Sequence, residues 1–214
     1  MTSLKITEIF YSLQGEARTV GLPTVFVRLT GCPLRCGYCD SEYAFYGGER
    51  LSLENILEKV ASFKPQYVCV TGGEPLAQRE CLSLLSALCD AGYQVSLETS
   101  GALSIEQVDS RVSRVMDLKT PGSGEVARNL WENIEYLGKQ DQVKFVICDR
   151  TDYEWAKFEM DRHQLASKTG EILFSPSFTQ LKPVELAEWI LEDKLPVRFQ
   201  LQLHKLLWND APGH

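Results

Sequence analysis

Short apolar runs rich in β-branched residues recur along the chain, separated by segments in which apolar residues are spaced differently. Runs of this length, bounded by turn residues, predict buried β-strands. The predicted strands are residues 24–29, 67–71, 93–99, 114–118, 142–147, 171–175 and 198–203.

Between most of these strands, apolar residues recur every three or four positions, which predicts helices. Gly92 and Gly138 stand where C-terminal helix caps are expected. The predicted helices are residues 51–63, 76–92, 124–138, 151–166 and 183–193.

Alternating strands and helices predict an α/β fold, with a parallel sheet covered by helices. A complete barrel of eight such units usually needs about 250 residues. The 214 residues therefore favour an incomplete, TIM-like barrel of about six strands, with a hairpin-like piece before residue 24. An open doubly wound sheet is the alternative. No repeat or long linker divides the chain, so we expect residues 1–214 to form one domain.

The composition limits the classes of partner that the chain is expected to bind. The chain is 44% apolar and 24% charged, as in globular proteins, and its formal charge is −7. An acidic chain is a poor match for nucleic acid, whose phosphates need clustered Lys and Arg. Residues 1–10 lack the apolar core of a signal peptide, and no apolar run approaches the roughly 20 residues that span a bilayer. We expect a cytoplasmic protein with no membrane or nucleic-acid partner.

Three of the seven cysteines, Cys32, Cys36 and Cys39, form a CxxxCxxC loop directly after a predicted strand. Three thiolates can hold one face of an iron–sulfur cubane, whose full protein set would be four, and one iron then stays open. Structural zinc is the alternative, although it needs a fourth ligand. The histidine candidates are His163, His204 and His214. The spacing favours the cluster, and we expect Cys69, Cys81, Cys89 and Cys148 to be core residues.

Polar and glycine-rich residues follow most of the predicted strands, where ligands bind in parallel α/β folds. VTGGEP (70–75) is one such segment, because glycines let the backbone approach a ligand closely. A tight turn before a helix starting at Pro75 is the alternative. Tyr38 could lay its ring against a purine or pack on the barrel rim.

In this order, the cysteine loop and TGGEP resemble the radical S-adenosylmethionine (SAM) superfamily. The resemblance implies that Cys32, Cys36 and Cys39 ligate a [4Fe–4S] cluster whose open iron binds the amino and carboxylate groups of SAM. Gly73 and Glu74 would hold its methionine end. In that superfamily the reduced cluster cleaves SAM to a 5′-deoxyadenosyl radical, which abstracts hydrogen from the substrate.

A closer resemblance rests on EIFYSLQGE (8–16), FVRLTGCPLRCGYCDS (26–41), LETSG (97–101) and QLHK (202–205). These segments resemble the 7-carboxy-7-deazaguanine synthase family of queuosine and deazapurine biosynthesis. That family converts 6-carboxy-5,6,7,8-tetrahydropterin to 7-carboxy-7-deazaguanine with loss of ammonia, uses magnesium and regenerates SAM. The resemblance further implies an electron donor such as a flavodoxin or ferredoxin, and a homodimer.

The resemblance also assigns roles to individual residues. Those expected at the substrate are Leu13, Gln14, Gly15, Arg28 and Thr71. Those expected at SAM are Tyr38, Gly73, Glu74, Asp117, Leu118, Lys119, Ser175, Pro176, Ser177 and Phe178. Ser41 stands where the family usually has a magnesium-binding threonine, and it keeps the hydroxyl.

Several assignments have structural alternatives. Arg28 could pair with Glu8 or Glu98, residues 13–15 could be a surface turn, and Lys119 could form a buried salt bridge. The chain departs from the family at Ala17, in the 117–125 loop and in the C-terminal QLHKLLWNDAPGH.

Two other functions stay open: an activating enzyme that places a glycyl radical on a partner protein, and a zinc-stabilised binding module.

Overall fold

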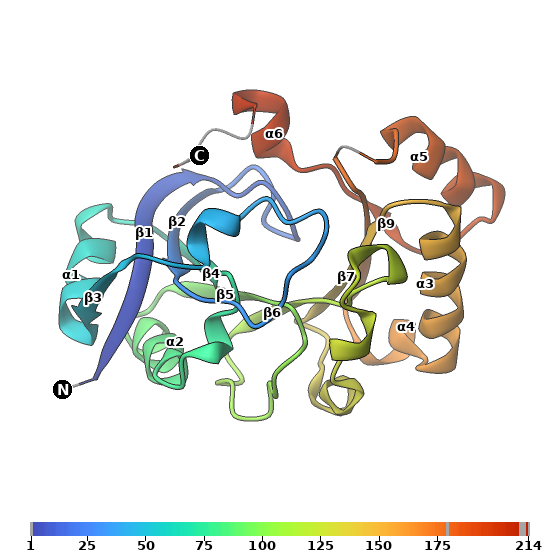
Figure 1. The fold of residues 1–214 in the computed structure, drawn as a ribbon. Helices are drawn as coiled ribbons and strands as arrows, with labels where there is room; N and C mark the ends of the chain where they lie inside the picture. The colour runs from blue at the N-terminus through green and yellow to red at the C-terminus, as the bar shows by residue number, and fades with distance from the viewer. Residues whose placement is uncertain (1, 179, 210–212, 214) are drawn as a thin grey trace.

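The computed structural model describes residues 2–178, 180–209 and 213. Within them, one curved nine-stranded sheet has the order β3-β1-β2-β4-β5-β6-β7-β8-β9 and stays open between β3 and β9 (Figure 1). The strands are β1 Ser3–Leu13, β2 Pro23–Leu29, β3 Glu49–Ser52, β4 Tyr67–Gly72, β5 Gln94–Thr99, β6 Ser113–Asp117, β7 Gln142–Ile147, β8 Glu171–Pro176 and β9 Arg198–Phe199.

The sheet is parallel from β2 to β9, while β1 pairs antiparallel with both β2 and β3. The incomplete barrel with an N-terminal hairpin is therefore confirmed, and β3 is an addition to it. Register places Glu8 opposite Arg28, Arg28 opposite Thr71, and Asp117 opposite Lys144. These pairings bring side chains distant in sequence to one end of the sheet.

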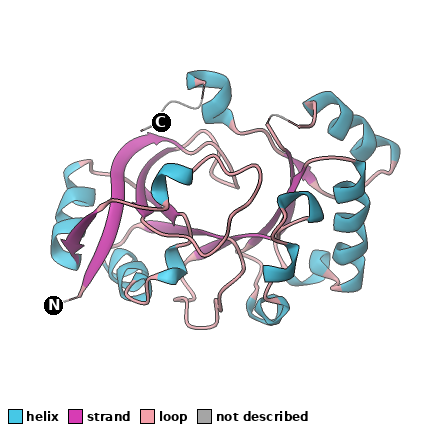
Figure 2. Ribbon diagram, in the orientation of Figure 1, coloured by secondary structure: helices cyan, strands magenta, loops and turns pink. Residues whose placement is uncertain are grey.

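The main helices lie around the outer side of the curved sheet (Figure 2). They are α1 Leu53–Ser62, α2 Cys81–Asp90, α3 Arg150–Arg162, α4 Leu165–Lys168 and α5 Pro183–Glu192. The last helix, α6 Leu203–Trp208, lies apart from them, at the top of Figure 1. Short 3-10 turns are η1 Glu42–Ala44, η2 Pro75–Ala77, η3 Pro121–Ser123, η4 Val126–Arg128 and η5 Trp131–Tyr136. Every helix in the described ranges is too short or too polar to span a membrane.

The core lies between the sheet and these helices. Val68 and Val70 of β4 and Leu84, Leu85 and Leu88 of α2 are fully buried members of one hydrophobic cluster. At roughly 1.5–3 kcal/mol for each buried aliphatic side chain, their burial is a large stabilising term. Cys69 and Cys81 are both fully buried, as expected for core cysteines. Cys81 belongs to this cluster, whereas Cys69 alternates with Val68 and Val70 and faces the other side of the sheet.

The predicted helix 124–138 is wrong, since this segment forms only η4 and η5. Asn129 exchanges two hydrogen bonds with the backbone of Lys119, at 2.8 and 2.9 Å. Asn133 donates to the carbonyls of Gly101 and Leu103. These hydrogen bonds to other loops stabilise the irregular conformation, although the spacing of the apolar residues is helical. Gly138 does not cap a helix, as its N–H donates to the carboxylate of Asp141.

Other predicted bounds also shift. The predicted strand 198–203 keeps only Arg198–Phe199, because Pro176 of β8 has no N–H to extend the ladder and the chain turns into α6. The predicted helix 151–166 divides at Gln164, which has a φ of +52°. Gly92 does follow α2 as expected, with a φ of +88°.

Candidate active site

A cavity of about 460 Å³ opens at the carboxyl ends of the strands. It is bordered by the ends of β1, β2 and β4 to β8, by the cysteine loop and by α6. All the predicted site residues line it except Glu74 and Leu118. Residues that are far apart in sequence therefore meet at one place, as the strand ends of a parallel sheet require.

The cysteine loop forms one part of the cavity wall. Cys32, Cys36 and Cys39 are free, half-buried and all line the cavity. Burial raises the pKa of Cys36 to about 11 and also raises the pKa of Cys32 and Cys39. Binding of a metal or cluster would therefore displace thiol protons. In the described ranges, no group of three His, Cys, Asp or Glu side chains is placed to hold a single metal ion.

The glycine segment after β4 packs directly against this loop. A Cβ atom on Gly73 would lie 2.4 Å from the carbonyl oxygen of Gly31 and 2.6 Å from Cβ of Cys32. The N–H of Glu74 donates to the same carbonyl at 2.8 Å. Glycine at position 73 is therefore required for the close approach of the two loops.

The structure does not bring the side chain of Glu74 into the cavity. Glu74 is fully buried, and its carboxylate accepts hydrogen bonds from the Leu76 N–H, the Thr99 hydroxyl, and the N–H and hydroxyl of Ser100. Leu118 is also fully buried. The carboxylate of Glu74 is thus occupied by donors of the protein itself, which fix the ends of β4 and β5 beside the cavity.

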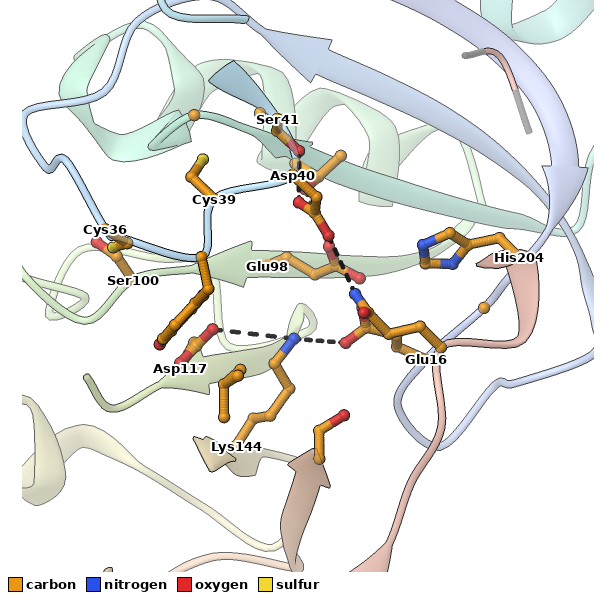
Figure 3. Close-up of a pocket in the computed structure, with 18 of the residues that line it drawn as sticks. Glu16, Cys36, Cys39, Asp40, Ser41, Glu98, Ser100, Asp117, Lys144 and His204 are labelled. Carbon is orange, nitrogen blue, oxygen red and sulfur yellow. Dashed lines mark hydrogen bonds and ion pairs between the residues drawn. The ribbon is translucent and has the colours of Figure 1, made fainter. Parts of the chain in front are cut away.

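A charged network crosses the cavity (Figure 3). The Lys144 ammonium donates to Glu16 and lies 3.8 Å from Oδ2 of Asp117, and Lys119 lies 3.0 Å from the same oxygen. Burial alone would lower the pKa of Lys144, but Glu16 and Asp117 outweigh it and raise that pKa. Lys144 therefore stays protonated and holds the two carboxylates in place.

The C-terminal segment closes a second side of the cavity. Lys205 Nζ lies 2.8 Å from Oδ2 of Asp40, and Gln202 donates to both Asp40 and Glu16. A Cβ atom on Gly15 would lie 2.1 Å from Nδ1 of His204, so the imidazole of His204 packs directly against the backbone of Gly15. Burial alone would raise the pKa of Asp40, but Lys205 outweighs it and lowers that pKa.

Of the two alternatives weighed for Arg28, the structure shows the ion pair with Glu8. Nε of Arg28 donates to Oε1 of Glu8 at 2.7 Å, and its guanidinium lies within 5.9 Å of the ring centroids of Phe10 and Tyr43. Burial alone would lower its pKa, but the acidic neighbours outweigh it and raise that pKa. Arg28 also lines the cavity, so its charge faces any ligand there.

Several polar atoms at the cavity have no hydrogen-bond partner among the described residues. They are the Tyr38 hydroxyl, Oδ1 of Asp117 and the Ser177 hydroxyl, and all three are buried. A buried polar group without a partner is costly. These atoms mark where a ligand with hydroxyl groups would supply the missing bonds.

Some charged residues of the cavity had no predicted role, namely Glu16, Asp40, Lys144 and Lys205. Glu98 and His204 had been considered only as a partner of Arg28 and as a zinc ligand. Lys144 carried a signal like that of Arg28, since it is a charge within an otherwise apolar strand. Glu16 and Asp40 belong to loops, Glu98 lies near the end of β5, and His204 and Lys205 lie on α6, so their meeting depends on the fold.

Comparison with known proteins identifies the family. Residues 26–113 match the model of the Radical SAM superfamily. The 7-carboxy-7-deazaguanine synthase of Chlorobaculum tepidum is 46% identical over 98% of this chain and 97% of that protein. The synthase of Koribacter versatilis is 43% identical over 96% of this chain and 97% of that protein.

Solved structures agree on the fold. The crystal structure of QueE from Escherichia coli aligns with a TM-score of 0.77 over 95% of this chain and 96% of that chain, at 23% identity. The glycyl-radical activating enzyme and the zinc-stabilised module are not favoured by these relatives. The chain belongs to the 7-carboxy-7-deazaguanine synthase family of the radical SAM superfamily.

Proposed function

We propose that this protein converts 6-carboxy-5,6,7,8-tetrahydropterin to 7-carboxy-7-deazaguanine with release of ammonia. The observation that carries the proposal is one cavity that contains both the three-cysteine loop and the half-buried guanidinium of Arg28. The relatives that match nearly the whole chain bear the name of this activity.

The cavity fits a [4Fe–4S] cluster with SAM. Three free thiols of one loop line it, and Gly73 exposes backbone beside them. The unpartnered atoms of Tyr38, Asp117 and Ser177 suit the hydroxyl and amino groups of a nucleoside. When bound, cluster and SAM supply reductive cleavage of SAM and hydrogen abstraction from the substrate.

The remaining wall fits a carboxylated pterin. Arg28 offers a planar cation to the substrate carboxylate. Glu98 lines the cavity and accepts from the Thr71 hydroxyl at 2.9 Å and from the Gln14 amide at 3.5 Å. The remaining lone pairs of the Glu98 carboxylate suit the N–H groups of the pterin edge. Lys144 holds Glu16 at the same cavity, so the carboxylates are in place before substrate arrives.

Magnesium is part of the proposal through Ser41, whose hydroxyl lies at the cavity. Mg²⁺ prefers oxygen ligands and keeps several waters, so one hydroxyl together with substrate oxygens is a suitable set. A one-electron carrier of the flavodoxin or ferredoxin class would reduce the cluster. We also propose that the protein acts in the cytoplasm as a homodimer.

The test is turnover under anaerobic conditions. Reconstituted protein receives 6-carboxytetrahydropterin, SAM, Mg²⁺ and a reductant, and product and ammonia are quantified together. The proposal predicts equal amounts of deazaguanine product and ammonia. SAM cleavage with unchanged pterin would contradict it, and would favour another radical reaction on this fold.

A further inference from the structure

The C-terminal segment is joined to the cysteine loop by an ion pair between buried Lys205 and the more exposed Asp40. Lys205 is only 6% exposed, and its Nζ lies 2.8 Å from Oδ2 of Asp40. Gln202 donates to the same oxygen at 3.2 Å and to Oε1 of Glu16 at 2.8 Å. The N–H of Leu203 donates to the carbonyl of Gly15 at 3.0 Å. These bonds fix one carboxylate oxygen of Asp40 from the C-terminal side.

The other carboxylate oxygen of Asp40 faces the next residue of the loop. The hydroxyl of Ser41 donates to Oδ1 of Asp40 at 3.0 Å, and both side chains line the cavity (Figure 3). A serine hydroxyl has one proton and two acceptor lone pairs. With its proton directed at Asp40, the lone pairs of Oγ remain for a cation.

Serine needs this hydrogen bond more than threonine would. A β-branched side chain is restricted at χ1 by its own methyl group, whereas serine turns among the staggered rotamers more freely. At position 41, where the family resemblance places a threonine, the direction of the hydroxyl depends on Asp40. The direction of Asp40 depends in turn on Lys205.

We propose that Lys205 and Asp40 are positioning residues that aim the hydroxyl of Ser41 at a divalent cation in the cavity. The inference rests on the proposed function, because that function supplies the cation. It assigns the QLHK segment a role that acts through the protein and does not require contact with substrate. Groups that orient a metal ligand commonly change metal affinity 10- to 100-fold when they are removed.

The experiment compares Lys205→Met, which keeps most of the stem without the charge, and Asp40→Asn with the wild type. Lys205→Arg preserves the cation, and Lys157→Met is the matched control, since Lys157 pairs with Asp193 on the helical side of the fold. The first readout is turnover against Mg²⁺ concentration. The second is Mn²⁺ binding, measured by electron paramagnetic resonance in reconstituted protein holding SAM and the pterin.

We expect the half-saturating Mg²⁺ and Mn²⁺ concentrations to rise about tenfold or more in Lys205→Met and Asp40→Asn. Lys205→Arg and Lys157→Met should stay close to the wild type. In a Ser41→Thr background, the effect of Lys205→Met should shrink, because the methyl group then restricts the hydroxyl.

Lower stability or turnover in Lys205→Met with unchanged cation dependence would overturn the inference, since the ion pair would then only support the fold. Wild-type protein that binds no Mn²⁺ would overturn it too. Mn²⁺ binding is measured without turnover, so it tests the positioning role of Lys205 and Asp40 independently of the proposed reaction. Binding that is lost in Lys205→Met supports the positioning role even where the pterin is not converted, which would sink only the proposed function.

Discussion

Replacement of Glu74 by glutamine separates a structural carboxylate from a cofactor ligand. Glu74 is fully buried and accepts hydrogen bonds from Leu76, Thr99 and Ser100 at 2.5–3.0 Å. Each of its two oxygens accepts from one backbone N–H, of Leu76 or of Ser100, and a backbone N–H can only donate. Glutamine has nearly the same shape, but an NH2 group replaces one of the two carboxylate oxygens and would face an N–H donor.

The magnitude follows from these bonds. A hydrogen bond to a charged group contributes about 1.5–3 kcal/mol, and a buried donor left unpaired costs about 1–3 kcal/mol. Because these two costs overlap for one lost bond, the replacement should lower the free energy of unfolding by about 2–4 kcal/mol in total. For a chain of this size, that corresponds to a melting temperature lower by about 5–15 °C. The variant should still fold, because domains are stable by about 5–15 kcal/mol.

The assay is urea unfolding followed by circular dichroism in the absence of SAM and iron. Glu188→Gln is the control, because Glu188 is exposed and its replacement should change stability by no more than about 0.5 kcal/mol. If Glu74→Gln were as stable as the wild type and bound SAM more weakly, the structural reasoning would be refuted. Glu74 would then be a cofactor ligand, as the sequence first suggested.

Three further predictions concern the substrate side of the cavity. Arg28→Gln should raise KM for the carboxylated pterin by about 10- to 150-fold, as a charged hydrogen bond of about 1.5–3 kcal/mol is lost, while the KM for SAM stays unchanged. Gly15→Ala should displace His204, whose Nδ1 the new Cβ would meet at 2.1 Å, and steady-state kinetics should show a higher pterin KM. Burial would raise the pKa of Glu16, but Lys144 outweighs it and lowers that pKa below its ordinary 4.5. Ionised Glu16 therefore contributes stability above pH 4.5, and this contribution is lost as the pH falls through the lowered pKa. Urea unfolding of wild type and Glu16→Gln should differ at pH 7 and converge in acid, and a constant difference would contradict this.

The strands of the sheet could be predicted because they are buried on both faces. The runs at 142–147 and 171–175 match β7 and β8 nearly residue for residue. Fully buried parallel strands read as continuous apolar runs, which local sequence shows directly.

The segment 124–138 could not be predicted in the same way. Its apolar spacing is helical, but Asn129 and Asn133 bond to backbone groups of other loops. Such long-range bonds leave no mark in the local pattern. For the same reason, the strand expected beyond Phe199 is absent from the described structure, because Pro176 lies on the neighbouring strand.

The candidate site was predictable where a motif or a misplaced charge marked it. The cysteines and Arg28 stood out, and they do line one cavity. Asp40 and Lys205 are 165 positions apart, and nothing in either segment indicates their ion pair. The position of Glu74 shows the converse limit: a motif can place a residue beside a site without placing its side chain in it.

The most direct test of the account is iron and sulfide analysis after anaerobic reconstitution, for wild type, Cys36→Ala and Cys89→Ala. Cys89 lies on α2, outside the cavity, and controls for the loss of any thiol. The account predicts about four irons and four sulfides in wild type and Cys89→Ala, with brown absorbance that is lost in Cys36→Ala. Colourless wild-type protein that holds one zinc ion would contradict it.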